Sequence, residues 1–312
     1  MRNFVNPKIW ILVFFALFLS SCLGSKARLL ELVPAESNMV VIINWATLRN
    51  DEGLKRVTKA EIYETQIKRF GIADEKVSDL VVFGIMGANR AQGGLLLRGS
   101  FDERMVLSKL KSQGWSETEL EGRKVYVNGA DYVYAPSESV LAAGTSEGLT
   151  AVFRASKNPG KSLANSPSYK KIKSSLAEGK SPFTAMLIAP DGTLEAVDAA
   201  LSVTGEVLSF FDMGEIGAIL KMLNIASGTG FTIAHGKNEK YAVSLSVLMR
   251  DEQTAKIAVG SLNILKNMSG AISDKKDKEA AEALQDFKFT REENVLLIKM
   301  QMPEKALLPG NY

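Results

Sequence analysis

The chain has 312 residues, of which 46% are hydrophobic and 23% are charged, and its formal net charge is +3. These values indicate a folded globular protein of one large domain or two ordinary ones, and they exclude a mostly disordered chain. A nearly neutral chain also lacks the concentrated basic surface that phosphate binding needs, so we expect no nucleic-acid partner.

Residues 1–21 have the layout of an export signal. Arg2 and Lys8 give a positive start without acids, and an unbroken apolar run follows from Ile9 to Leu19. A helix that spans a membrane needs about 20 residues to cross about 30 Å of hydrocarbon, and this run is much shorter. The segment is therefore predicted to be a cleaved signal peptide, and its removal lowers the net charge by two.

The residues after the apolar run indicate lipid attachment. Leu19-Ser20-Ser21-Cys22 resembles the lipobox of bacterial lipoproteins, in which an aliphatic residue and two small residues precede cysteine. The resemblance implies a diacylglycerol on the Cys22 thiol, cleavage between Ser21 and Cys22, and acylation of the new amine. Cys22 is the only cysteine, so lipidation would exclude disulfides and thiol catalysis. The alternative is an ordinary secretory signal with a chance cysteine.

The residue that follows Cys22 indicates which membrane would hold the anchor. An Asp there resembles the inner-membrane retention signal of Gram-negative lipoproteins, but this chain has Leu23. We therefore expect a lipid anchor in the outer membrane, facing the periplasm or the surface, if the host is Gram-negative. In a Gram-positive cell the same protein would lie on the outer face of the plasma membrane.

The mature chain is predicted to begin with a lipidated N-terminus and linker, residues 22–38, followed by a first α+β half, residues 39–156. Asp102 is expected to cap the second helix of this half, because its carboxylate can accept hydrogen bonds from unpaired amides. Strands are expected at 39–44, 80–86, 93–98, 115–120, 124–127, 132–134 and 140–143, and helices at 45–70, 102–113 and 147–155.

A connecting segment with a short helix, residues 157–181, is predicted to follow. The second α+β half is residues 182–303, and residues 304–312 form a tail. Asp251 is expected to cap a helix that runs to about Met268. Strands are predicted at 183–189, 230–234, 241–249, 287–290 and 295–300, and a long helical region is predicted from Leu194 to Leu223.

The two halves show a similar order of elements. Leu95–Glu103 and Val247–Glu252 share the pattern of strand, arginine, acid pair and helix. Each half reads β-α-β-β-α-β, which resembles a ferredoxin-like unit with helices on one face of an antiparallel sheet. The predicted fold is therefore α+β, with two ferredoxin-like halves and separate antiparallel sheets.

Two further segments carry a second resemblance. Leu32–Ser37 precedes the first strand, and Ser162–Tyr169 precedes the middle helix. These segments resemble a family of bacterial envelope proteins known only as a domain of unknown function. The resemblance implies no catalytic residues.

The candidates for catalysis have simpler explanations. His235 is the only histidine, and it precedes Gly236 at a predicted hairpin turn. A serine–histidine–acid triad would have to use it, and no Gly-x-Ser-x-Gly elbow is present. Neighbouring acids such as Asp251 and Glu252 point about 100° apart on a helix and do not converge. We therefore expect no enzyme activity, metal or cofactor.

The segment from Leu194 to Leu223 is the strongest candidate for a binding region. It contains Phe210, Phe211 and Leu220 among many apolar residues. It is either a core helix or a groove for an acyl chain or partner helix. The expected function is a non-enzymatic envelope lipoprotein that binds another protein or has a structural role. The alternative is a carrier or sensor of a lipid or other apolar ligand.

Overall fold

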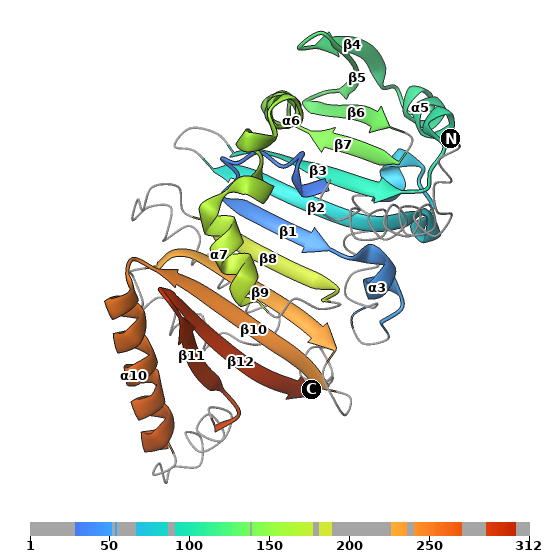
Figure 1. Ribbon diagram of the computed structural model, residues 1–312. Helices are drawn as coiled ribbons and strands as arrows, with labels where there is room; N and C mark the ends of the chain where they lie inside the picture. Colours follow the sequence, from blue (N-terminus) through green and yellow to red (C-terminus); the bar gives the residue numbers. More distant parts are fainter. Residues whose placement is uncertain are drawn as a thin grey trace, which may run out of the picture.

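A computed structural model describes residues 29–51, 54, 67–86, 91–137, 139–176, 181–188, 226–235, 240–269 and 285–303. They form one continuous sheet of 12 strands, in which neighbouring strands are antiparallel (Figure 1). The order across the sheet is β11-β12-β10-β9-β8-β1-β2-β3-β7-β6-β5-β4. The strands are β1 (Met39–Ile43), β2 (Val77–Met86), β3 (Ala91–Gly99), β4 (Ser116–Leu120), β5 (Arg123–Asn128), β6 (Asp131–Ser137), β7 (Val140–Gly144), β8 (Phe183–Ile188), β9 (Ala226–His235), β10 (Lys240–Met249), β11 (Lys288–Glu292) and β12 (Val295–Pro303).

The pairing of β1 with β8 joins the two halves into this single sheet. Met39 lies opposite Leu187, and Ile43 lies opposite Phe183. A buried side-chain contact also crosses between the halves, because the Tyr241 hydroxyl donates to Asp51 Oδ1 at 2.5 Å. The expectation of separate sheets is therefore wrong, since the first strands of the two halves satisfy each other's backbone groups.

The α+β class with antiparallel strands is confirmed, but the ferredoxin-like strand order is not. In a split β-α-β unit, the two strands joined by the helix are parallel and are separated by a third strand. Here β1 and β2 are adjacent and antiparallel. From the β1–β8 junction outward, the order β1-β2-β3-β7-β6 is repeated as β8-β9-β10-β12-β11. The halves thus share an arrangement, although it is a different one from that predicted.

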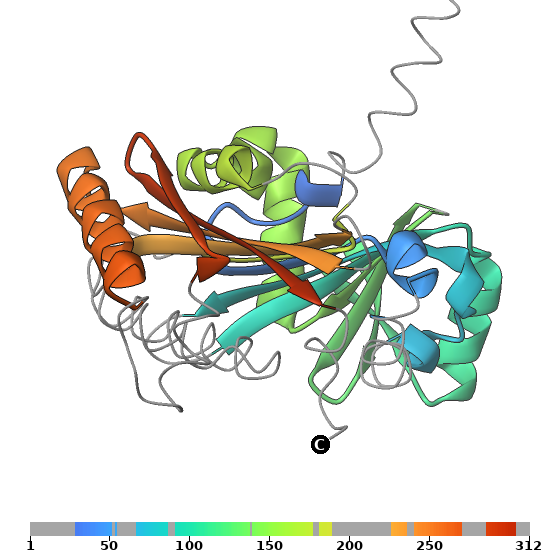
Figure 2. The ribbon, with the colours of Figure 1, turned by 90° about the horizontal axis from the view of Figure 1, so that it is seen from below.

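Helices cover both faces of the sheet, and not the single face that was expected. The apolar cluster on one face includes residues of α3, α5 and α10, whereas the cluster on the other includes α6, α7 and residues 29–33. Figure 2 shows α6 and α7 together on one side of the sheet. The helices are α3 (Trp45–Arg49), α5 (Glu103–Ser112), α6 (Ser146–Lys157), α7 (Pro167–Ser175) and α10 (Glu252–Ser269), with short 3-10 helices η2 (Lys68–Phe70), η3 (Asp74–Lys76), η4 (Pro159–Lys161) and η5 (Leu163–Asn165).

Both predicted aspartate caps are confirmed. The Arg104 amide donates to Asp102 Oδ1 at 2.8 Å at the start of α5. The Thr254 amide donates to Asp251 Oδ1 at 2.7 Å at the start of α10. This backbone hydrogen bond holds the pKa of the Asp251 carboxyl below its usual value, because it stabilises the charged form. The caps explain why the sequence located these helix starts closely.

Small residues let α7 pack closely on the second half of the sheet. Gly230 of β9 lies beneath Ile172 and Leu176, and Ser246 of β10 is buried beside it. A Cβ added at Gly230 would lie 2.8 Å from Ser246 Oγ and closer still to Ile172 Cγ2. Atoms in a close-packed interior have little room to move, so this position cannot accept a side chain without displacing α7.

We predict that Gly230→Ala lowers the free energy of unfolding by about 1–3 kcal/mol, because it overpacks this contact. Gly260→Ala is the matched control, since a Cβ there meets nothing within 4 Å. This control should raise stability by roughly 0.5–1 kcal/mol, because alanine favours helix interiors. Urea denaturation of both variants tests the prediction, and equal effects would contradict the close α7 contact.

The connecting segment begins with an exposed stretch of chain. Residues 156–161 are exposed and include η4, whereas Ser162 and Leu163 are buried. Among the described residues, we expect trypsin to cut first after Lys157, because proteases need accessible backbone. Limited proteolysis with mass spectrometry of the first fragments tests this. An earlier cut after Arg98 would contradict it, because Arg98 lies within β3.

Candidate functional site

The residues predicted to carry function lie outside the described part of the chain. They are Ser21 and Cys22 at the lipobox, and Phe210, Phe211 and Leu220 in the long helical region. Their roles stay predictions. His235 is the last residue of β9 and pairs in register with Tyr241 of β10. It therefore lies where the hairpin was expected to turn.

The chain enters the fold soon after the predicted anchor. Leu29 lies seven positions after Cys22 and is only 2% exposed. Leu30 and Val33 are 7% and 0% exposed, and all three belong to the apolar cluster on the face that α6 and α7 cover. Any lipid on Cys22 would therefore be joined to the folded protein by a short segment.

Backbone hydrogen bonds hold this N-terminal segment in place. The Leu163 amide donates to the Val33 carbonyl at 2.8 Å, and the Ala35 amide donates to the Lys161 carbonyl at 2.9 Å. The Asn38 carbonyl accepts from the Ile188 amide at 2.7 Å. The segment is thus attached both to the connection between α6 and α7 and to the central strand β8.

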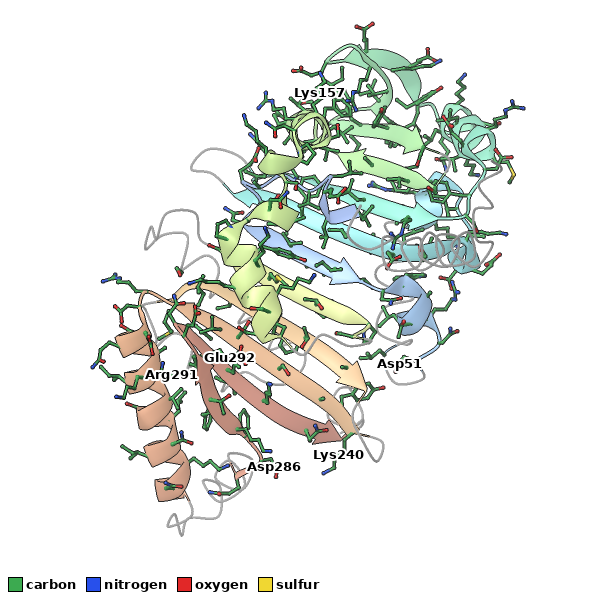
Figure 3. The ribbon with its side chains drawn as sticks, viewed as in Figure 1. Asp51, Lys157, Lys240, Asp286, Arg291 and Glu292 are labelled. Carbon is green, nitrogen blue, oxygen red and sulfur yellow. The ribbon has the colours of Figure 1, made fainter. Side chains whose placement is uncertain are left out.

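The same connection carries a concentration of positive charge. We call it the α6–α7 basic surface, and it consists of six exposed cations: Arg154, Lys157, Lys161, Lys170, Lys171 and Lys173. No acid occurs in the sequence between Glu147 and Glu178. The position of Lys157 at the end of α6 can be followed in Figure 3. The adjoining segment contributes two exposed acids, Glu31 and Glu36, so cations predominate.

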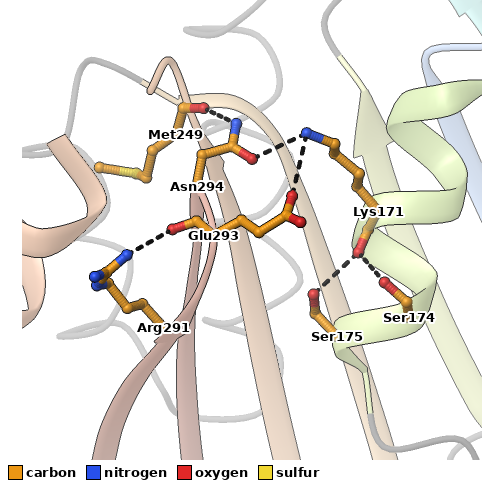
Figure 4. A network of polar contacts seen from close by, with 7 residues as sticks. All are labelled: Lys171, Ser174, Ser175, Met249, Arg291, Glu293 and Asn294. Atoms are coloured by element: carbon orange, nitrogen blue, oxygen red, sulfur yellow. Dashed lines mark hydrogen bonds and ion pairs between the residues drawn. The ribbon is translucent and has the colours of Figure 1, made fainter. Parts of the chain in front are cut away.

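A network of polar contacts holds α7 against the β11–β12 turn (Figure 4). Lys171 Nζ donates to Asn294 Oδ1 at 3.3 Å and lies 3.7 Å from Glu293 Oε2. Asn294 Nδ2 in turn donates to the Met249 carbonyl at 2.7 Å. These contacts connect α7 to the β11–β12 turn beside the exposed lysines of the helix.

A shallow groove of about 640 Å³ lies between α5 and the segment after η2. Lys68 and Lys109 contribute its charged groups, and Met105 and Ile72 contribute apolar surface. Met105 is among the large apolar side chains that the described structure exposes. The groove lies among residues of the opposite apolar cluster, away from the N-terminal segment.

The described residues contain neither a group of metal ligands nor a helix able to span a membrane. No three His, Cys, Asp or Glu side chains among them are grouped so that they could bind a metal ion. Within the same ranges, none of the helices is both long and apolar enough to cross a membrane.

Comparisons with known proteins give no family. No protein-family model matches the chain, and no curated protein matches it. Among solved structures, crystal form I of TP0453 is 12% identical, with a TM-score of 0.48 over 89% of this chain and 94% of that one. Crystal form III of TP0453 is 14% identical, with a TM-score of 0.47 over 89% and 95% of the two chains.

The α6–α7 basic surface was missed in the sequence because the charge was averaged over the whole chain. A window over Arg154–Lys173 contains six cations and no acid. This local excess of cations is visible in the sequence and would have identified the segment as a basic surface. The sequence did not show that these residues lie on the same face as the N-terminal segment.

Proposed function

We propose that the protein is a lipid-anchored lipoprotein of the bacterial cell envelope, which binds another envelope protein or has a structural role and does not catalyse a reaction. The observation that carries the proposal is the Leu19-Ser20-Ser21-Cys22 motif directly after an apolar export signal. The burial of Leu29 supports it, since the fold begins within a few residues of the proposed anchor.

The fold also suits a protein that acts close to a membrane. The N-terminal segment is hydrogen-bonded to the α6–α7 connection through Val33 and Ala35. A chain attached this way keeps the fold close to its proposed anchor, whereas a long flexible linker would let it move farther away. A position close to the membrane suits a protein that binds a partner of the envelope.

The proposed anchor can be tested on the native protein by detergent phase separation. A protein that carries two or three acyl chains should enter the detergent phase, because each buried CH₂ contributes about 0.8 kcal/mol. Complete recovery of the mature protein in the aqueous phase would contradict the anchor.

A second candidate is a carrier or sensor of a lipid or other apolar ligand, motivated by Phe210 and Phe211 in the Leu194–Leu223 region. Purification of the full lipidated protein from detergent-solubilised membranes separates the two candidates. Reproducible protein partners favour the first. Bound lipid that is lost in a Phe210→Ser/Phe211→Ser variant, while the covalent acyl chains remain, favours the second.

A further inference from the structure

We propose that the α6–α7 basic surface rests on the anionic phospholipid headgroups of the membrane in which Cys22 is anchored. The proposal depends on the lipid anchor described above and adds to it a defined contact between protein and membrane. Three observations lead to it. The N-terminal segment joins the fold beside α6 and α7, exposed cations are concentrated there, and the apolar residues of α7 are buried against the sheet.

The N-terminal segment places this face next to the anchor. The stretch from Cys22 to Leu29 can extend over at most about 25 Å, because an extended residue spans about 3.5 Å. Leu29 and Val33 are buried in the apolar cluster that α6 and α7 cover. The Ala35 amide donates a hydrogen bond to the backbone carbonyl of Lys161, a residue of the basic surface. The anchor therefore reaches the fold beside these cations.

The charges on this face favour an anionic surface. Among the described residues, the surface has six exposed cations, and the exposed acids near it include Glu31, Glu36 and Glu293, the last of which lies 3.7 Å from Lys171. Clusters of Lys and Arg next to a membrane attachment are attracted to anionic headgroups over about one Debye length, which is about 10 Å at 0.1 M salt. The N-terminal segment would keep the fold within about 25 Å of the anchor, so the cations can come within that range of the headgroups.

The packing of α7 indicates contact with the headgroups and not insertion. Its apolar residues Tyr169 and Ile172 are buried against the sheet, together with Leu176 after the helix. Lys170 and Lys173 are exposed. Because the apolar side of the helix is buried against the sheet, its outer side exposes charged groups and little hydrophobic surface. The surface is thus suited to electrostatic attraction at the membrane.

The test uses the mature lipidated protein in vesicles of phosphatidylcholine alone or mixed with phosphatidylglycerol. An amine-reactive reagent labels the lysines, and mass spectrometry measures each labelling rate. In anionic vesicles, Lys157, Lys161 and Lys170 should react roughly threefold to fivefold more slowly, and high salt should remove this protection. Lys109 and Lys111 of α5 are internal controls and should react equally in both vesicles.

A pair of variants sharpens the result. Lys170→Gln/Lys173→Gln should weaken the protection of Lys157 and Lys161, whereas Lys109→Gln/Lys111→Gln should leave it unchanged. Equal labelling in neutral and anionic vesicles, with normal flotation of the protein in both, would overturn the proposed surface contact alone. Failure to float with neutral vesicles would instead overturn the lipid anchor, and the contact that depends on it.

Discussion

Replacing Cys22 with alanine is expected to abolish incorporation of a fatty-acid analogue completely and to leave an unprocessed precursor. The thiol is the nucleophile that would accept the diacylglycerol, and no other cysteine in the chain can replace it. Metabolic labelling followed by electrophoresis measures both effects, because the precursor keeps its 21-residue signal. The effect should be all-or-none.

Ser20→Ala is the matched control for this experiment. Alanine keeps the small side chain that precedes the cleavage position, so labelling and processing should remain normal. Undiminished labelling of Cys22→Ala would show that the acyl group is attached elsewhere or that the motif is a coincidence. Loss of labelling in both variants would indicate disturbed export. The control therefore distinguishes removal of the acylated thiol from a failure of export.

The second large effect is expected from the buried ion pair between β2 and β3. Arg98 Nε donates to Asp79 Oδ2 at 3.2 Å, and Arg98 Nη2 contacts the same oxygen. The two side chains are only 13% and 10% exposed. Removing one partner leaves a charge with little water and no counterion. Arg98→Met is therefore predicted to lower the free energy of unfolding by about 3–5 kcal/mol.

The double variant Asp79→Leu/Arg98→Met should be much more stable than Arg98→Met. It removes both charges, and apolar side chains of similar size can replace a buried pair at little cost. Arg98 Nη1 has no hydrogen-bond partner in the described structure, so the native pair is imperfectly satisfied. Urea denaturation of Arg98→Met and of the double variant tests this. A double variant that is no more stable than Arg98→Met would contradict the coupling between the two charges.

The exposed pair of Lys124 and Glu117 provides a contrast. Their side chains are 61% and 44% exposed, and the Lys124 hydrogen bond lowers the pKa of Glu117. Water screens such a pair, so Lys124→Gln should change stability little. A loss as large as that of Arg98→Met would show that burial is not what makes the β2–β3 pair important.

Much of the local structure could be predicted from the sequence. Most predicted strand ends lie within a few residues of the observed ones, since a short apolar run bounded by turn residues is a local signal. Asp102 and Asp251 indicated where α5 and α10 begin, because a cap acts on the amides of the next residues. The export signal and Cys22 were also readable, since these features are recognised as linear sequence.

The arrangement of the strands was decided only by the tertiary structure. The same apolar pattern in β1 is compatible with many partners, and its pairing with both β2 and β8 depends on residues far away in the chain. That pairing merged the two halves into one sheet and determined which helices cover each face. The tertiary structure also brought Val33 and Ala35 into hydrogen bonds with Leu163 and Lys161. Local sequence determines where elements begin and end, whereas the burial of both faces of the sheet selects their neighbours.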